Sequence, residues 1–383
     1  MKRFTVPLLI LFIVSGLFCF SANAEEADSE TETAIVLEAG PIIEIPDENG
    51  TGWTEQFQQV TLKVTSGKFK NQVFETINNL SGNSLYDIPV KKGDKVVVVI
   101  ERAEDGTPEI FISDYMRQHY ILYLSAFFVA VVLFIGKGKG LRSLITLALT
   151  MFAIFKILLP GILKGHHPVF LTVLISFGIT VITFFIVSGI NGKSIAAILG
   201  TTGGVMAAGI LAYFVGSRVK LTGLSPEEAS FLMYLPQGTD FDLQGLLFSG
   251  IIMGSLGAVM DVAISIASSI EEIHRTNPSL PSKNLFLSGM NVGKDIIGTM
   301  TNTLILAYTG SSIPLLIVFM AYETSIVKIL NLDVIATEVI RSLAGSTGLV
   351  LTIPITALAA GLLIKKPLRI RKIKEETADQ IGS

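Results

Sequence analysis

The sequence is poor in cysteine, tryptophan, histidine and charge, and each shortage excludes a class of protein. Of the 383 residues, one is cysteine, one is tryptophan and four are histidine. Cys19 lies in a predicted leader, so disulfides and cysteine-bound metals are excluded from the rest of the chain. Charged residues make up only 16%, and the formal net charge of −3 argues against a nucleic-acid-binding protein.

The chain is rich in hydrophobic residues. They make up half of the sequence, and the mean hydropathy is +0.61, which places most of the chain in a lipid bilayer. We therefore expect a polytopic α-helical membrane protein of seven or eight helices. The apolar segments lie at 120–135, 143–159, 168–189, 194–215, 245–270, 296–310, 312–330 and 339–364.

The N-terminus has the features of a secretory signal peptide over residues 1–24. Lys2 and Arg3 precede an apolar core, and small residues ending at Ala24 form a cleavage site. An uncleaved anchor helix is the alternative. Residues 25–33 are acidic and lack apolar side chains, so we expect a disordered spacer there.

A β-rich region precedes the hydrophobic part. Residues 34–113 contain about five short segments of β-branched or alternating residues, separated by Gly, Pro and Asn. This pattern predicts a small extracytoplasmic all-β domain, a barrel of OB-like outline. A transmembrane helical domain is expected over 114–365, and residues 366–383 form a basic tail.

The lysines and arginines of short loops predict the orientation. The loop with Lys137, Lys139 and Arg142 is purely basic and should be cytoplasmic, and the 271–283 loop and Lys193 fall on the same side. We expect a bacterial plasma-membrane protein with its β-domain outside and its C-terminus in the cytoplasm.

The count of spans conflicts with that orientation. Eight crossings that begin outside must end outside, whereas the basic tail requires the cytoplasm. One segment should therefore not span. The favoured one is 284–310, as a surface or re-entrant helix, and 339–364 is the other candidate.

Small and polar residues recur along one face of 245–273. Their spacing of 4, 3, 4, 4, 3 and 4 puts them on one stripe of a helix. Asp261 lies near its middle, where a charge costs about 2.5–3.5 kcal/mol and requires a partner or water. We expect an ion-binding carboxylate between helices; an Asp bonded to hydroxyls or paired with lysine is the alternative. The stripe is Gly250, Gly254, Gly257, Asp261, Ser265, Ser268 and Glu272.

A second polar stripe consists of Asn291, Asp295, Gly298 and Asn302, spaced 4, 3 and 4. Facing the first stripe, it would gather oxygen ligands suited to Na⁺, H⁺ or a hard divalent cation. An interfacial helix with a solvated polar face is the alternative. Glu323, inside an apolar run, is a further candidate. No cofactor and no defined metal site are expected.

Charged residues near the ends of the last segments have a simpler interpretation. Lys328, Asp333 and Arg341 are expected to extend toward lipid headgroups.

A G-x-x-G-x-V frame occurs three times, as GTTGGVM (200–206), GSLGAVM (254–260) and GSTGLVL (345–351). The first two should lie on helices of opposite direction, as in inverted repeats. Chance recurrence of small-residue packing motifs is the alternative. The predicted helix-packing residues are Gly200, Gly204, Gly250, Gly254 and Gly257.

The run GSLGAVMDVAISIASSIEEI, followed by GKDIIGTMTNTLILAY and LDVIATEVIRSLAGSTGLVLTIPITAL, resembles the YibE/F-like family of multi-pass bacterial membrane proteins. The resemblance covers about 120–365, and the leader and β-rich region suit the longer, YibE-like members. It implies an integral membrane protein and assigns no activity or site residue.

Three functions remain open. The favoured one is a permease or channel-like protein for a small ion or polar solute, with Asp261, Asp295 and Asn302 at its site. The second is an envelope assembly or sensory partner, in which the polar faces are contacts within a homo-oligomer or with another envelope protein. The third, an intramembrane hydrolase with an aspartate dyad, lacks the GxGD motif and has no YD pair within the predicted helical domain, so an enzyme is not expected.

Overall fold

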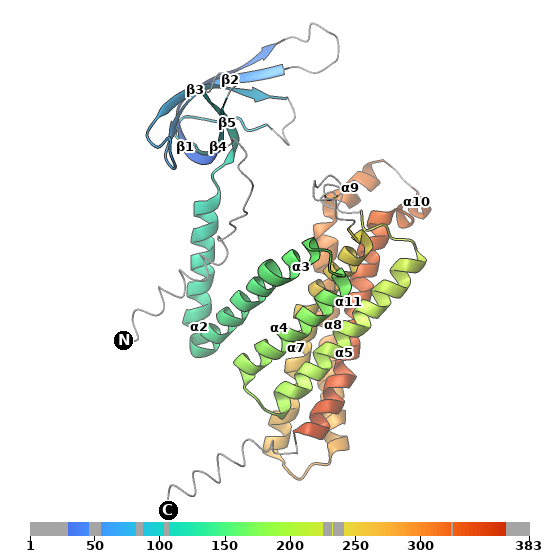
Figure 1. Ribbon diagram of the computed structural model, residues 1–383. Coiled ribbons are helices and arrows are strands. Elements are labelled where there is room, and N and C mark those ends of the chain that lie inside the picture. Colours follow the sequence, from blue (N-terminus) through green and yellow to red (C-terminus); the bar gives the residue numbers. More distant parts are fainter. Residues whose placement is uncertain are drawn as a thin grey trace, which may run out of the picture. The chain divides into compact units, whose positions relative to one another are not determined.

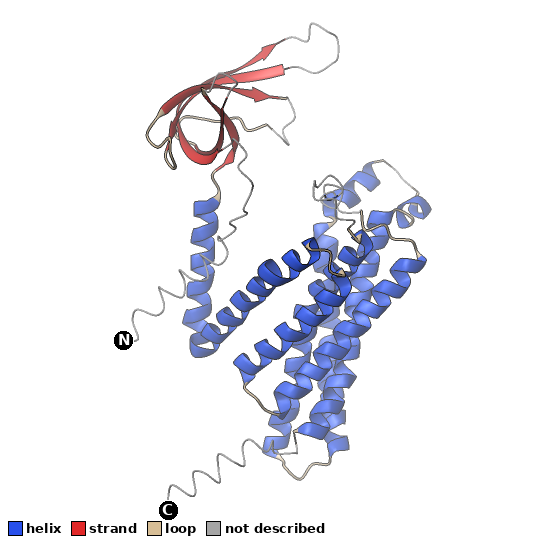
Figure 2. Ribbon diagram, viewed as in Figure 1, coloured by secondary structure: helices blue, strands red, loops and turns tan. Residues whose placement is uncertain are grey.

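The computed structural model describes residues 30–45, 55–81, 87–102, 107–224, 232, 241–322 and 325–364. The chain divides into two compact units, Met1–Val131 and Val132–Ser383. The first holds all the described strands and the second holds nearly all the described helices (Figure 1, Figure 2). The predicted signal peptide, the basic tail 366–383 and Glu323 lie outside the described residues.

The first unit is a curled antiparallel sheet. Its strand order is β3-β2-β1-β4-β5. The curl brings the two outer strands together, where the Thr76 hydroxyl of β3 donates a hydrogen bond of 2.7 Å to the Ile110 carbonyl of β5. The strands are β1 (Glu30–Ile45), β2 (Glu55–Val64), β3 (Val73–Leu80), β4 (Lys95–Arg102) and β5 (Pro108–Tyr115).

Alternation of apolar residues explains the core of the sheet. In β2 and β4 every second side chain faces inward, as the two-residue period of a strand requires. These inward residues are buried: Val60, Leu62, Val64, Val96, Val98 and Ile100.

A buried amide fixes the segment before β4. The Gln58 Nε2 donates to the carbonyls of Val90 (2.8 Å) and Gly40 (3.0 Å), and its Oε1 accepts from the Val90 amide (3.1 Å). The Asn78 Nδ2 donates to the Ile88 carbonyl at 2.9 Å. These bonds satisfy polar groups that burial would otherwise penalise.

The first strand begins earlier than the sequence predicts. Residues 30–33 were expected in a disordered spacer, yet they belong to β1, where Glu30 is opposite Ile100 and Thr33 is opposite Val97. The Thr33 hydroxyl also lies 2.7 Å from that of Thr65. Pairing with a valine-rich strand outweighs the acidic composition that favoured disorder.

The second unit consists of long helices. Five are long and apolar enough to cross a membrane, or six if the bent pair α8 and α9 counts as one. The helical elements are α2 (Gln118–Ala153), η1 (Ile154–Leu158), α3 (Leu159–Leu163), α4 (Pro168–Ser188), α5 (Gly192–Arg218), α7 (Leu243–Thr276), α8 (Ser282–Ser311), α9 (Ile313–Ala321), α10 (Ile326–Leu330) and α11 (Asp333–Leu363).

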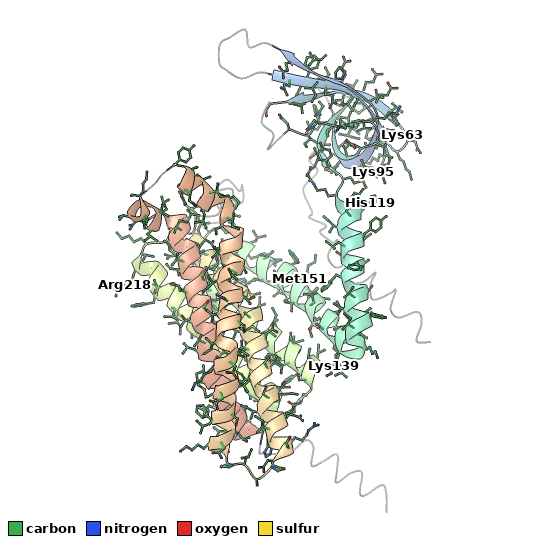
Figure 3. All side chains as sticks on the ribbon, turned by 180° about the vertical axis from the view of Figure 1, so that it is seen from behind. Lys63, Lys95, His119, Lys139, Met151 and Arg218 are labelled. Carbon is green, nitrogen blue, oxygen red and sulfur yellow. The ribbon has the colours of Figure 1, made fainter. Side chains whose placement is uncertain are left out.

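Helix α2 is broken at Lys137, which has φ 46° and ψ −126°. After the break, Gly140 lies so close to the Val132 carbonyl that a Cβ atom added to the glycine would collide with the carbonyl oxygen. The predicted basic loop is therefore a sharp break, and the basic side chain of Lys139 directly follows it (Figure 3).

Helices α5 and α11 form the closest pair of the bundle. A Cβ atom added at Gly204 would clash with the Thr352 hydroxyl and lie 2.7 Å from the Gly348 carbonyl. One added at Gly200 would clash with the Thr356 hydroxyl. The two helices run antiparallel, so the first and third G-x-x-G motifs meet there.

The other helices pack around this pair. α7 contacts α5 and α11, while α4 lies against α7 and α5. α8 packs against α11 and α7 and continues for 30 residues before a bend of 60° into α9. The sequence predicted separate apolar segments at 296–310 and 312–330, whereas residues 282–311 form one helix that bends into α9. A bent pair of this kind is a broken span or a re-entrant segment, and a re-entrant helix was one of the two predicted forms of 284–310.

Candidate functional site

Helix α7 carries the first predicted stripe. The Asp242 side chain caps its start by accepting from the Gly245 amide at 2.7 Å. Ile252, Val259 and Ile266, spaced by seven, are at most 1% exposed and face the bundle.

The opposite face of α7, with Asp261 and Ser265, is exposed on the surface of the described structure. The sequence predicted that this stripe would be enclosed between helices. The structure buries the wider aliphatic face instead, where Ile252 packs against Gly209 of α5 and Ile270 against Gly289 of α8.

The glycines of this stripe are uncovered in the described structure. No heavy atom outside the helix's own backbone lies within 4 Å of a Cβ atom built at Gly250 or Gly257. At Gly254 such an atom would lie 2.8 Å from the hydroxyl oxygen of Tyr308 in α8. The close helix approach expected along this stripe is thus limited to one point.

Helix α8 carries the second stripe. Asn291, Asp295 and Asn302 are all exposed. Two contacts set the heights of α7 and α8: Gly254 with Tyr308, and Ile270 with Gly289.

From these contacts, Asp261 lies about level with residues 298–302. Ser265 and Ser268 lie about level with Asp295 and Asn291. The two stripes do not form the predicted single cluster, because the α8 stripe lies on the side of α8 away from the buried residues Gly289 and Gly293. They are two exposed rows at matching heights, which we call the polar ladder: Asp261, Ser265, Ser268, Asn291, Asp295 and Asn302.

The ladder has the chemistry of weak, repeated coordination. It offers carboxylate, amide and hydroxyl oxygens at successive heights. The Thr301 hydroxyl, near the height of Asp261, is buried and has no hydrogen-bond partner within the described residues. In the part of the chain that the structure describes, no group of three or more His, Cys, Asp or Glu side chains could hold a metal ion.

A charged pair on α11 was not selected from the sequence as a site. The Arg341 Nη1 lies 2.7 Å from the Glu338 Oε1, and both side chains are less than a quarter exposed. The guanidinium also lies over the Tyr308 ring, 5.9 Å from its centroid. Arg341 was expected to extend to headgroups; it is held against α8 instead. The three-residue spacing of Glu338 and Arg341 was the available signal.

A cavity of about 330 Å³ adjoins this pair, between α8 and α11. Tyr308, Thr309, Ser312, Glu338 and Ser342 contribute its polar groups. Because Tyr308 touches Gly254 as well as Arg341, it connects the charged pair to the upper end of the polar ladder.

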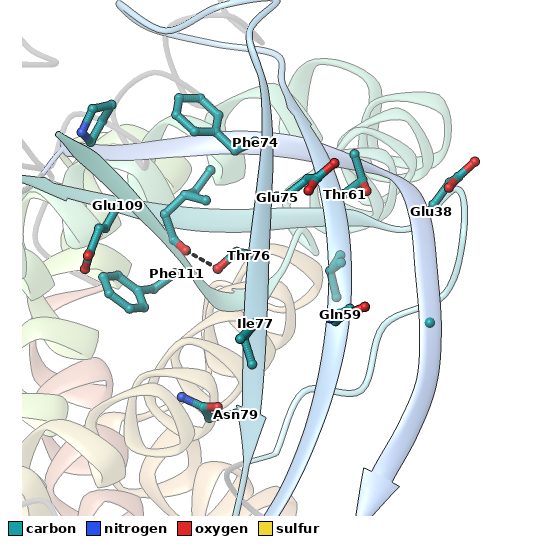
Figure 4. Close-up of a pocket in the computed structure, with 14 residues that line it drawn as sticks. Glu38, Gln59, Thr61, Phe74, Glu75, Thr76, Ile77, Asn79, Glu109 and Phe111 are labelled. Carbon is teal, nitrogen blue, oxygen red and sulfur yellow. Dashed lines mark hydrogen bonds between the residues drawn. The ribbon is translucent and has the colours of Figure 1, made fainter.

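The β unit carries a separate groove of about 700 Å³. It lies between β3 and β5 and extends over β2 to β1 (Figure 4). Three glutamates line it, Glu38, Glu75 and Glu109, together with the exposed rings and chains of Phe111 and Ile77. No local sequence pattern indicated this groove, because its residues come from four strands.

These features define the class: a predominantly helical protein with five or six candidate membrane spans, preceded by a small curled β-sheet domain. The chain belongs to the YibE/F-like protein family, whose model matches residues 124–366. The YibE/F family N-terminal domain matches residues 30–115. Both matches confirm the resemblance found in the sequence. No curated protein and no solved structure matches the chain.

Proposed function

We propose that this chain is a seven-span protein of the bacterial plasma membrane. The break at Lys137 divides α2 into two helical arms, each near the length of the hydrocarbon core. The bent pair α8 and α9 is one broken span, and α4, α5, α7 and α11 complete the seven. An odd number removes the conflict between span count and basic tail.

Contacts at one end of the bundle support an orientation in which that end faces the cytoplasm. Lys193 at the start of α5 pairs with Glu271 near the end of α7 at 2.7 Å. Gly192 touches Leu363 at the end of α11, and Gly361 touches Ser282 at the start of α8. The basic residues near these ends place them in the cytoplasm.

The β domain is then extracytoplasmic and of OB-like form. Its strand order and the approach of β3 to β5 support a barrel that is nearly closed.

In this proposal the protein is a permease or channel-like transporter of a small ion or polar solute, and it is not an enzyme. The observation that carries it is the polar ladder, whose exposed groups on α7 and α8 form the proposed polar route. Near one end of α8, Tyr308 lies beside Gly254 of α7 and under the guanidinium of the Glu338–Arg341 pair. Such groups cannot face lipid, because a mid-span carboxylate alone costs about 2.5–3.5 kcal/mol there. Water or a transported ion stabilises them.

Flux measurements test the role of Asp261. Purified protein in liposomes is assayed with entrapped Na⁺- and pH-sensitive dyes. We expect Asp261→Asn to lower the flux at least about ten-fold, equivalent to about 1.4 kcal/mol of lost interaction with the ion. Asp242→Asn is the matched control, because asparagine also caps a helix and Asp242 lies at the start of α7, away from its middle. Equal flux in wild type and Asp261→Asn refutes the role.

The second candidate is an envelope assembly or sensory partner without transport activity. The observation that favours it is that the same polar faces are uncovered and could be covered by another subunit. Purification in mild detergent separates the two: a stoichiometric partner that is lost on deletion of 34–113, with no flux in liposomes, supports the second candidate.

A further inference from the structure

The groove of the β unit follows an open seam in the sheet. In the described strands, β3 pairs only with β2 and β5 pairs only with β4. The Thr76–Ile110 bond joins a side chain to the backbone and leaves no ladder between the two strands. On either side of this bond the facing edges have no backbone ladder in the described strands, so each edge keeps donors and acceptors that can pair with a further strand.

The charge of the groove selects its occupant. Glu38, Glu75 and Glu109 line it, and no lysine or arginine does so. No hydrogen-bond or ion-pair partner is found for these three carboxylates in the described structure. An anionic ligand such as a nucleic acid is repelled by this surface, whereas lysine and arginine side chains complement it.

Apolar side chains alternate with these acids. Ile77 and Phe111 are 55% and 44% exposed within the groove, and Ile77 stands two residues from Glu75 on the same face of β3. A strand added at the seam presents every second side chain to this face. An occupant with both basic and apolar side chains matches it.

We propose that the seam between β3 and β5 binds an extended, basic peptide segment of another protein by strand addition. Beside the Thr76–Ile110 bond, the backbone of the segment pairs with the free edge of β3 or of β5, its lysines or arginines meet Glu75 and Glu109, and its apolar side chains cover Ile77 and Phe111. This inference specifies the partner class of the second candidate function and is independent of the transport route.

A defined peptide tests the proposal on the full chain in nanodiscs. The probe is a fluorescently labelled Lys-Val-Lys-Val-Lys-Val-Lys peptide, followed by anisotropy. We expect saturable binding that weakens at least about ten-fold in the variant Glu75→Gln/Glu109→Gln. Glu30→Gln is the matched control, because Glu30 lies outside the groove in an exposed pair with Lys68.

Three further probes separate strand addition from general charge attraction. A peptide with a central proline removes a backbone donor and should bind more weakly. A Glu-Val repeat and oligothymidylate should not bind. Equal binding of the proline peptide, unchanged binding to Glu75→Gln/Glu109→Gln, or preference for oligothymidylate overturns the proposal. Flux assays on the same variants distinguish its failure from that of transport.

Discussion

The same G-x-x-G motif has different surroundings in α5 and α7. In α5, Gly204 lies under Thr352 and the Gly348 carbonyl of α11, so a larger side chain has no room. In α7, Gly257 has open space beside it in the described structure. The difference lies in the neighbours of each glycine: α11 offers a matching small-residue face, whereas the α7 stripe also holds Asp261. Spacing thus defines a face of a helix, and the partner decides whether that face is buried.

The strongest test of this contrast replaces one glycine in each helix by leucine. Gly204→Leu must displace Thr352 and backbone of α11, and we expect it to lower the free energy of unfolding by about 3 kcal/mol or more. Gly257→Leu enters open space and should leave stability near that of wild type. Thermal unfolding in detergent measures both.

Equal destabilisation by the two leucines contradicts the contrast. It would mean that the α7 stripe is packed against a partner in the purified protein. Analytical ultracentrifugation of Gly257→Leu then identifies the partner as a second copy if the variant is smaller than wild type.

Cysteine labelling tests the same contrast through the accessibility of single side chains. The only natural cysteine is Cys19, so a single introduced thiol is readily assigned once Cys19 is replaced by serine. Ser265→Cys is exposed on the polar ladder and should react with a water-soluble maleimide in membranes. Thr356→Cys, buried against Gly200, should react at least about ten-fold more slowly.

A reversed order of the two labelling rates contradicts the polar route. Slow labelling at both sites also does so, because it places Ser265 against lipid or protein. Oxidative cross-linking of Ser265→Cys between two chains supports a homo-oligomeric contact instead.

The sequence predicted those features that depend on local residue patterns. Alternation in 34–113 predicted the five-stranded sheet, and the apolar runs predicted the long helices. The spacing of Asp261 and Ser265 correctly put them on one helix face. Whether that face is enclosed depends on how α4, α5, α8 and α11 pack, which no local pattern contains. The same holds for the groove, whose glutamates come from three strands.

The exposed ion pair of Asp114 and Arg117 on the β unit should give the smallest stability effect of these predictions. A hydrogen bond from the Arg117 side chain lowers the pKa of Asp114 below its ordinary value, and a bond from the Tyr115 amide adds a smaller lowering. A lowered pKa contributes stability above the unfolded-state pKa and loses it as the pH falls through the folded-state pKa.

We therefore expect Arg117→Gln to destabilise the β unit at neutral pH and to match wild type at strongly acidic pH, where Asp114 is protonated in both. Since both side chains are about half exposed, the difference at neutral pH should stay below about 1 kcal/mol and shrink further in high salt. Urea unfolding followed by near-UV circular dichroism measures it. A difference that persists in acid assigns the effect to packing of Arg117 over the Tyr115 ring, 5.8 Å away, and not to its charge. The water-exposed pair thus differs from the polar ladder in what stabilises its charges. Bulk water solvates the pair, whereas an ion or a partner must stabilise the polar groups of the ladder.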